Sequence, residues 1–329
     1  MAAQGITLGY DFLRRPANFA IGEAPIAYSP ADTFGRAILV GLLNTVRVSV
    51  AGWVLAIAVG FVLGVMRLAD TPVLRAVTRS FVELLRNTPL LLLLLFLAAT
   101  LHALPPPRKA LSPMPGVYLS DRGLVLPSPV AGAVAWSLGV VLLVVSLGGR
   151  RLGRWRWPLA GALVVSLAAT LVAHPPGMDV PHTTTFGFAG GLTLSPELAA
   201  LLGALVLHHG AHVSEVVRGA VLAVPRGQRE AAYALGLTRF DATRLVVVPQ
   251  ALRAMIPLLA ANCVSLTKNS SLAVAIGFPD VVSVLNTTAN QTGHSIETML
   301  LMIVLYLTMS LATAGVMARY NARVSRPVR

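Results

Sequence analysis

Three histidines stand close together in one apolar segment, at His208, His209 and His212. His208 and His212 are four residues apart, so on a helix they share one face, which is the geometry of a zinc-binding pair. A metal site also needs further ligands or a general base, and the sequence places no obvious third ligand nearby, so we expect no metal. The other interpretation is that the histidines line a polar path or tune it with pH, because imidazole changes charge near neutral pH.

A second polar group interrupts another apolar run and consists of Lys268, Asn269, Ser270 and Ser271. Polar groups are costly inside a bilayer unless they face protein or water, so each one is a candidate for a transport path. The Lys268 ammonium could bind the carboxylate of an amino acid, or backbone carbonyls at a broken helix could satisfy it. Asn44 and Thr45 could likewise bind a substrate, although bonds between helices are the commoner use of such residues.

The remaining polar residues of the apolar segments have simpler interpretations. Glu215 and Arg218 are three residues apart, which predicts an ion pair within one helix at the membrane edge. Arg86 and Thr88 begin an apolar run, where snorkelling and capping explain them. The single cysteine, Cys263, excludes an internal disulfide, and its apolar surroundings predict a structural thiol. A membrane enzyme would need a nucleophile with a base or a metal cluster, and only the histidines offer weak support for one.

The composition indicates a membrane protein. The chain has 329 residues, of which 55% are hydrophobic and 12% charged, and its mean hydropathy is +0.73. Soluble domains contain about 25% charged residues. The net charge of +13 does not indicate nucleic-acid binding, because the basic residues stand in clusters between apolar runs and not along a polar surface.

Seven apolar stretches approach the roughly 20 residues that a spanning helix needs, at 37–66, 87–104, 130–148, 157–173, 197–217, 256–278 and 297–318. When Lys and Arg are assigned to the connections, 18 fall on one side of the membrane and six on the other. Because basic residues are retained in the cytoplasm, we expect the amino terminus outside and the carboxyl terminus inside. Proline-rich 105–129 cannot be a regular helix, so we expect an irregular outer loop there and another at 174–196.

One polar stretch of about thirty residues, between the fifth and sixth predicted spans, has the pattern of an ordered loop. Residues 228–235 are good helix formers with one apolar face, and Gly236 is predicted to end that helix. A second short helix follows, with Phe240, Thr243 and Val247 at helical spacing, and Pro249 leads back to the membrane. A long loop with such order is typical of a docking surface.

This loop resembles the EAA loop of ABC importer permeases, whose helix inserts into a groove on the ATP-binding subunit. The residues that match the motif are Glu230, Ala231, Ala232, Gly236 and Pro249. Three further segments resemble motifs of the permease family for histidine, glutamine and general L-amino acids. They are Arg-Asn-Thr-Pro-Leu-Leu at 86–91, Glu-Val-Val-Arg-Gly at 215–219 and Lys-Asn-Ser-Ser-Leu at 268–272. Segments 28–32 and 41–45 resemble the branch that moves acidic amino acids and their amides.

The resemblance implies an all-α integral membrane protein with a MetI-like core of five helices and an inserted helical hairpin at 130–173. The expected domains are an outer segment 1–35 and a permease domain 36–320 with an insertion at about 105–196. Within and after that domain we expect a cytoplasmic coupling loop 225–250 and a basic cytoplasmic tail 321–329. Members of this branch usually begin with one more spanning helix. Members of the family often carry Gln at the position of Leu93, so a polar contact that Gln would make is missing in this chain.

The resemblance also implies the function and the partners. The chain would be a multi-pass permease subunit of the bacterial inner membrane, importing polar L-amino acids. Its partners would be a second permease subunit, identical or different, two ATP-binding subunits and a periplasmic amino-acid-binding protein, but no nucleic acid. No Gly-x-x-x-x-Gly-Lys-Ser/Thr motif occurs, so ATP would bind only to the partner ATPase and the chain would carry no cofactor. The alternative, an ion-coupled secondary transporter or channel, is less favoured, because the central parts of the membrane segments contain no Asp or Glu and no internal repeat is found.

Overall fold

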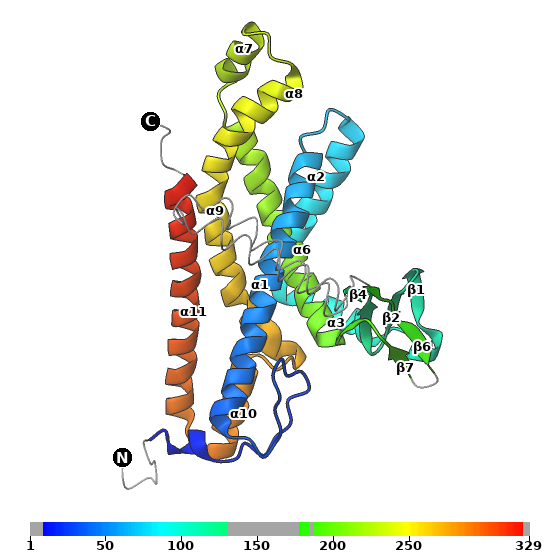
Figure 1. The fold of residues 1–329 in the computed structure, drawn as a ribbon, viewed down its shortest axis with the longest axis vertical. Coiled ribbons are helices and arrows are strands. Elements are labelled where there is room, and N and C mark those ends of the chain that lie inside the picture. The colour runs from blue at the N-terminus through cyan, green and yellow to red at the C-terminus, as the bar shows by residue number, and fades with distance from the viewer. Residues whose placement is uncertain (1–8, 130–177, 185–186, 325–329) are drawn as a thin grey trace, which may run out of the picture. The chain divides into compact units, whose positions relative to one another are not determined.

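The computed structural model describes residues 9–129, 178–184 and 187–324. The chain forms two compact units (Figure 1). The first consists of Met1–Ala98 with Ala200–Arg329, and the second of Ala99–Ala199. The second unit encloses the predicted insertion 105–196. Two of the predicted spans, 130–148 and 157–173, lie outside the described residues.

Long helices make up the first unit. In chain order its helices are α1 (Phe34–Met66), α2 (Pro72–Asn87), α3 (Leu90–His102), α6 (Pro196–Leu222), α7 (Arg226–Ala234), α8 (Arg239–Ala242), α9 (Val248–Asn269), α10 (Val281–Thr292) and α11 (Ser295–Val324). Three short turns of 3₁₀ or π geometry accompany them, at Asp11–Arg14, Thr243–Val247 and Ser270–Ile276. In the described residues four helical segments are long and apolar enough to cross a membrane, or five if a bent pair counts as one span. Four of the predicted core spans therefore have a matching helix, at α1, α6, α9 with its 3₁₀ extension, and α11.

The bent pair corrects the second predicted span, 87–104. Helices α2 and α3 meet at an angle of 102°, and α3 has only 13 residues. The cause is Pro89, because proline pushes the residue before it out of the helical region. Thr88 accordingly has extended backbone angles (φ −83°, ψ 125°), while its hydroxyl donates to the Leu84 carbonyl at 2.8 Å.

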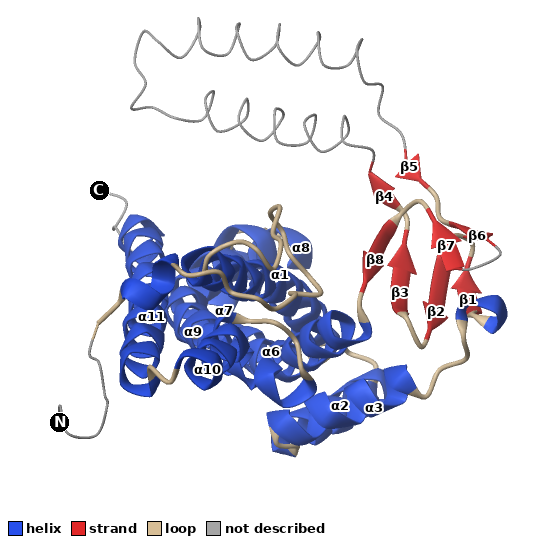
Figure 2. Cartoon of the chain, turned by 90° about the horizontal axis from the view of Figure 1, so that it is seen from below, coloured by secondary structure: helices blue, strands red, loops and turns tan. Residues whose placement is uncertain are grey.

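Strands in the second unit correct the expected irregular outer loops. They are β1 (Leu111–Met114), β2 (Val117–Ser120), β3 (Gly123–Leu126), β4 (Ser128–Pro129), β5 (Met178–Asp179), β6 (His182–Thr184), β7 (Gly187–Ala189) and β8 (Leu192–Leu194). Figure 2 shows β8, β3, β2 and β1 side by side, and their pairing is antiparallel throughout. The prolines do exclude a helix, but Pro113 lies on an edge strand and Pro115 in a turn, where a missing N–H breaks no central ladder.

Helix α1 is the element against which the others pack, and small residues allow the close approach. A Cβ placed on Gly41 would lie 3.0 Å from the Asp280 carbonyl oxygen before α10, and one on Gly52 would lie 3.1 Å from Leu266 of α9. A Cβ on Gly60 would lie 2.5 Å from Val213 Cβ, and one on Gly64 2.7 Å from Val217 Cβ, both on α6. Such contacts drive helix association in a bilayer, where lipid removes the hydrophobic driving force.

We therefore expect Gly60→Ala to destabilise the fold by about 1–3 kcal/mol, because the new methyl group overlaps Val213 and the Gly210 carbonyl oxygen at 2.6 Å. Gly219→Ala is the matched control, since nothing lies within 4 Å of a Cβ there. Alanine should be neutral or stabilising at that helical position. Thermal unfolding of the purified variants measures the difference. Equal melting temperatures for the two variants would contradict the packing of α1 on α6.

Candidate functional site

The predicted loop helix is α7, and it ends at Gly236 as expected. The Gly236 N–H donates to the Tyr233 carbonyl at 2.9 Å, and the Leu237 N–H donates to the Ala232 carbonyl at 3.1 Å. This pair of bonds is a Schellman motif, which needs a residue with positive φ. Gly236 has φ 80°, and nothing lies within 4 Å of a Cβ built there. The backbone conformation therefore requires glycine at position 236, whereas neighbouring atoms would leave room for a side chain.

The second loop helix differs from the prediction of a separate short element. Helix α8 is capped by the Thr238 hydroxyl, which accepts from the Asp241 N–H at 3.1 Å. A π-helical turn at Thr243–Val247 then joins it to α9, so that one helical segment runs from Arg239 to Ile276. Pro249 directly follows this turn, at the second residue of α9, and has no N–H to donate to the turn before it. The loop is consequently a direct extension of a membrane helix.

Large apolar side chains are exposed around α7 and α8. The exposed fractions are 83% for Leu235, 70% for Phe240 and 46% for Tyr233. Figure 1 shows both helices at one end of the bundle, opposite the end that holds α10. Of the motif residues, Glu230, Ala231, Gly236 and Pro249 are exposed, and Ala232 is buried. We name the exposed surface formed by Tyr233, Leu235 and Phe240 the coupling surface; an apolar patch of this kind is typical of a docking site.

Two contacts fix α7 to the membrane helices. The Arg229 guanidinium donates to the Val221 carbonyl near the end of α6 at 3.0 Å. The Gln250 amide of α9 donates to the Gln228 side chain at 3.4 Å. A cluster of buried Val213, Val217, Val247, Ala251 and Met255 packs α6 against the start of α9. Any displacement of α7 therefore acts on two spanning helices at once.

Asn44 and Thr45, which the sequence offers as substrate contacts, are fully buried. The Asn44 amide donates to the carbonyls of Glu23 and Pro279 at 2.8 and 2.9 Å. The Thr45 hydroxyl accepts from the Val281 N–H at 3.1 Å and donates to the Gly41 carbonyl at 3.0 Å. These bonds hold α1 to the start of α10. They agree with the alternative interpretation, in which Asn44 and Thr45 form hydrogen bonds between helices.

The polar group at 268–271 lies where α9 changes into a 3₁₀ helix. The Ser270 hydroxyl donates to the Thr267 carbonyl and the Ser271 hydroxyl to the Lys268 carbonyl, both at 2.8 Å. These local bonds occupy the two serines. The Lys268 side chain is exposed on the bundle, so among these residues it is the one free to meet a ligand or a partner chain.

His209 connects α6 to α9 through both of its ring nitrogens. Its Nδ1 lies 3.1 Å from Asn262 Oδ1 and its Nε2 lies 3.2 Å from Asn269 Nδ2, both on α9. An amide oxygen must accept and an amide nitrogen must donate, so the neutral ring with its proton on Nδ1 satisfies both bonds. The His208 and His212 rings lie edge to face, with centroids 4.9 Å apart. The described residues contain no group of three potential metal ligands.

Glu215 is paired more extensively than the sequence predicts. Besides Arg218 of the same helix, whose Nε lies at 3.2 Å, its carboxylate binds Arg67 at 2.6 Å and Arg86 at 3.4 Å. Arg67 follows α1 and Arg86 stands near the end of α2. The sequence indicated only the local pair, since nothing in it shows which distant arginines reach one carboxylate.

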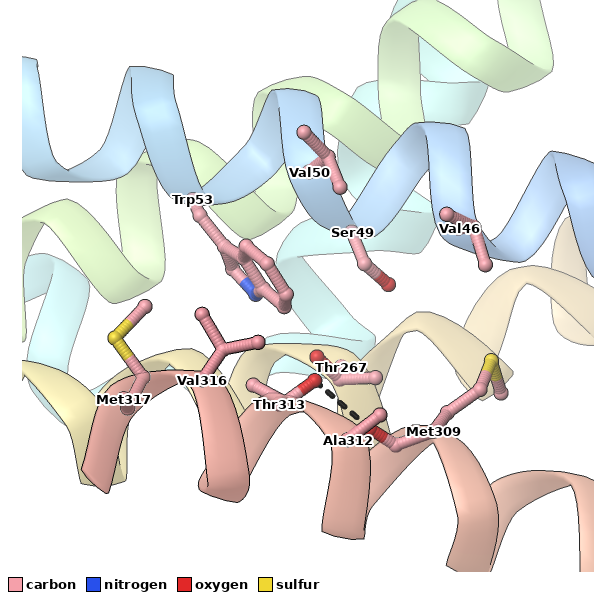
Figure 3. A pocket seen from close by; sticks show the side chains of 10 residues that line it. All are labelled: Val46, Ser49, Val50, Trp53, Thr267, Met309, Ala312, Thr313, Val316 and Met317. Carbon is pink, nitrogen blue, oxygen red and sulfur yellow. Dashed lines mark hydrogen bonds between the residues drawn. The ribbon is translucent and has the colours of Figure 1, made fainter. Parts of the chain in front are cut away.

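An apolar cavity of about 210 Å³ lies between α1, α9 and α11 (Figure 3). Its polar groups are mostly occupied by nearby carbonyls: Trp53 Nε1 and the Thr267 hydroxyl both donate to the Cys263 carbonyl at 3.0 Å. The Ser49 hydroxyl points into the space between the helices and has no hydrogen-bond partner in the described part of the chain. The cavity presents no charged group, so it suits an apolar occupant and not a polar amino acid.

Comparison with known proteins decides the family. Residues 56–326 match the family model described as the binding-protein-dependent transport system inner membrane component. The chain belongs to this family of permeases. The resemblance predicted from the EAA loop and its flanking motifs is thereby confirmed.

The permease is similar to three curated proteins over nearly its whole length. It is 42% identical to the putative amino-acid ABC transporter permease YhdX of Escherichia coli K12, over 98% of this chain and 86% of that protein. It is 37% identical to the general L-amino acid transport system permease AapQ of Rhizobium johnstonii, over 99% and 86%. It is 35% identical to the glutamate/glutamine/aspartate/asparagine permease BztB of Rhodobacter capsulatus, over 98% and 87%.

Solved structures show the same fold. A crystal structure of an amino acid ABC transporter with histidines superposes with a TM-score of 0.56 at 19% identity, over 88% of this chain and 95% of that chain. An inward-facing MetNI methionine ABC transporter gives 0.53 at 14% identity, over 88% and 97%. The permease thus has the MetI-like fold. It is a multi-pass, non-enzymatic membrane component that works with an ATPase and a substrate-binding protein, as its family does.

The two contacts of His209 with α9 predict a measurable contribution to stability. His209→Leu leaves both asparagine side chains without this partner and should lower stability by about 1–3 kcal/mol. A double-mutant cycle with Asn262→Leu should give a coupling of about 1 kcal/mol, typical of hydrogen bonds between membrane helices. Unfolding in detergent measures both values, with His212→Leu as the control that removes an imidazole without these two bonds. A coupling near zero would show that the contact contributes nothing.

Asp280, between the predicted spans, yields a second prediction. Its carboxylate caps α10 by accepting from the Ser283 N–H at 2.9 Å, and burial raises its pKa to about 6. The folded state then holds a proton that the unfolded state releases near pH 4. Stability should therefore fall as pH rises from about 4 to about 6, by at most a few kcal/mol. Asp280→Asn should remove this dependence of stability on pH and raise the melting temperature at pH 7. An unchanged pH dependence in the variant would contradict the assignment to Asp280.

Proposed function

We propose that the permease is a subunit of an ATP-driven importer for polar L-amino acids, and that the α7–α8 loop receives the movement of the ATPase. The observation that carries the proposal is the coupling surface, which is apolar and exposed. A hydrogen bond joins it to α6, and a continuous helical segment joins it to α9. The substrate class rests on the names of AapQ and BztB, which refer to general L-amino acids and to glutamate, glutamine, aspartate and asparagine. ATP would bind only to the partner, and this chain would carry no cofactor.

We place the coupling surface in the cytoplasm of a bacterial cell, with the chain crossing the inner membrane. The end of the bundle that carries α7 and α8 also holds Arg67, Arg218, Arg239 and Arg244. Basic residues accumulate on the cytoplasmic side of membrane proteins. Helix α11 then brings the carboxyl terminus to that same side.

The assembly would contain two permease subunits, two ATPase subunits and a periplasmic binding protein. Apolar side chains of α1 and α11 are exposed in the single chain, among them Val54, Phe61, Ile303 and Leu307. Such surfaces suit lipid and a second permease subunit. Lys268 is exposed within the span, so it could face a path between two subunits, where water and a substrate carboxylate would satisfy its charge. His208, His212 and Asn269 remain candidates for lining that path.

The contacts of the loop give the proposed coupling a mechanical basis. When the ATPase subunits close, they would displace α7, whose Schellman turn sets a fixed angle to α8. Because α8 continues through the π-helical turn into α9, the displacement tilts α9 without a flexible joint. The Arg229 bond to the Val221 carbonyl transmits the same movement to α6. The spanning helices would then alternate between outward and inward access.

The coupling surface is tested with Leu235→Asp and Gly236→Val. Leu235→Asp places a charge in the apolar contact without touching the fold, because this side chain is 83% exposed. Gly236→Val strains the turn, because a β-branched residue rarely adopts positive φ. Both should lower amino-acid uptake and co-purification of the ATPase by about tenfold or more. Normal uptake by both variants would refute the proposal.

Gly315→Ala in α11 is the matched control, since a Cβ there has only the end of the Arg319 side chain near it, at 3.9 Å. Its uptake should equal that of the unaltered chain. The amount of each variant in the membrane fraction must be equal. A variant that fails to insert would be replaced by Phe240→Asp, whose exposed side chain lies on the same surface.

A further inference from the structure

A second cavity, of about 370 Å³, lies between the end of α1, the helix α2 and the last third of α6. Charged side chains line it: Arg67, Arg75, Arg79, Glu83, Arg86, Glu215 and Arg218. We name it the arginine cavity. It differs from the coupling surface and from the histidines, and the proposed transport mechanism does not use it.

Positive charge exceeds negative charge in this cavity. Five guanidinium groups meet two carboxylates, so three positive charges are uncompensated. Glu215 is already shared by Arg67, Arg86 and Arg218, and Glu83 is held by Arg79 at 2.7 Å. The Arg75 guanidinium has no hydrogen-bond or ion-pair partner in the described part of the chain. An additional anion would therefore be stabilised here.

The cavity is preformed. Arg67 is only 8% exposed, and charged side chains are buried to this extent almost only when they are paired. Its bond to Glu215 at 2.6 Å, with those of Arg86 and Arg218 to the same carboxylate, fixes three guanidinium groups around one point. Guanidinium presents several N–H donors in one plane, so groups held in this way retain donors for an oxyanion.

We propose that the arginine cavity binds the phosphate group of an anionic phospholipid. Its depth favours a lipid headgroup, because Arg67 directly follows the apolar helix α1 and Arg218 stands in the last turn but one of α6. The ends of spanning helices lie at the level of the headgroups. Basic pockets between such helices on the cytoplasmic side bind acidic lipid headgroups.

Helix α2 has one basic and one apolar face, which supports the same occupant. Val73, Val77 and Leu84 form an exposed apolar stripe along it. Arg75, Arg79 and Arg86 each stand two residues after one of these apolar residues. Two residues correspond to a rotation of about 200° on a helix, so the arginines lie on nearly the opposite face. The apolar face suits contact with lipid chains, and the basic face attracts anionic headgroups.

Charge also favours a phosphate over a transported amino acid as the occupant. Every free amino acid carries an α-ammonium group, which three surplus guanidinium charges would repel. Phosphatidylglycerol and cardiolipin carry phosphate and no ammonium group. A phosphate offers oxygens to several guanidinium groups at once, which is the geometry that arginine recognises. Free inorganic phosphate shares this chemistry, so the experiment must separate the two sources.

The experiment uses the assembled transporter in nanodiscs of neutral phosphatidylcholine, to which cardiolipin or phosphatidylglycerol is added. Each anionic lipid should raise the melting temperature of the unaltered protein. Arg75→Gln combined with Arg79→Gln should reduce that rise at least by half, while native mass spectrometry should show less bound cardiolipin. These two residues are chosen because they do not hold Glu215, so the fold should tolerate their loss.

Arg253→Gln combined with Arg319→Gln is the matched control, because it removes two exposed charges from helices that do not line the cavity. Its response to cardiolipin should equal that of the unaltered protein. Equal loss in both double variants would overturn the site in favour of general surface charge. Full protection by inorganic phosphate alone, or protection by L-glutamate that depends on Arg75 and Arg79, would also overturn the lipid assignment.

Discussion

The rest of the structure depends on how closely α1 approaches its neighbours. Gly41, Gly52, Gly60 and Gly64 stand along one helix. A Cβ on each would lie 2.5–3.1 Å from atoms of α9, α6 or the start of α10, closer than an ordinary van der Waals contact. The hydrogen bonds of Asn44 and Thr45 add directional contacts at one end, and Glu215 with Arg67 adds charge at the other. One helix thus holds together elements that are far apart in sequence.

Continuity is the second constraint on function. The π-helical turn between α8 and α9 keeps the coupling surface in one helical segment with a membrane span, and Arg229 ties α7 to α6. A flexible linker at Thr243–Val247 would absorb the movement of an ATPase. The arginine cavity lies between α1, α2 and α6, so a bound lipid would bear on one of the two helices that α7 displaces.

Local features were predictable from the sequence, and contacts across the bundle were not. Helical periodicity and Gly236 predicted α7 and its end, because the conformation of glycine is a local property. Residues 105–129 were mistaken for an irregular loop, since proline excludes helix but leaves edge strands and turns open. The roles of Asn44, His209 and Arg67 depend on partners far away in the sequence. Asn44 binds residues 21 and 235 positions away, His209 binds residues 53 and 60 positions away, and Arg67 binds a residue 148 positions away. Local sequence patterns do not reveal such partners.

The Cys263 carbonyl accepts from both Trp53 and Thr267, and it therefore marks the contact between α1 and α9. Trp53 is the one tryptophan among the described residues, and Cys263 is the single cysteine of the whole chain. In the described conformation the thiol is buried. An intrinsic fluorophore and a unique chemical handle thus stand on the two sides of one helix interface. The accessibility of this thiol can follow the separation of these helices during transport without an introduced label site.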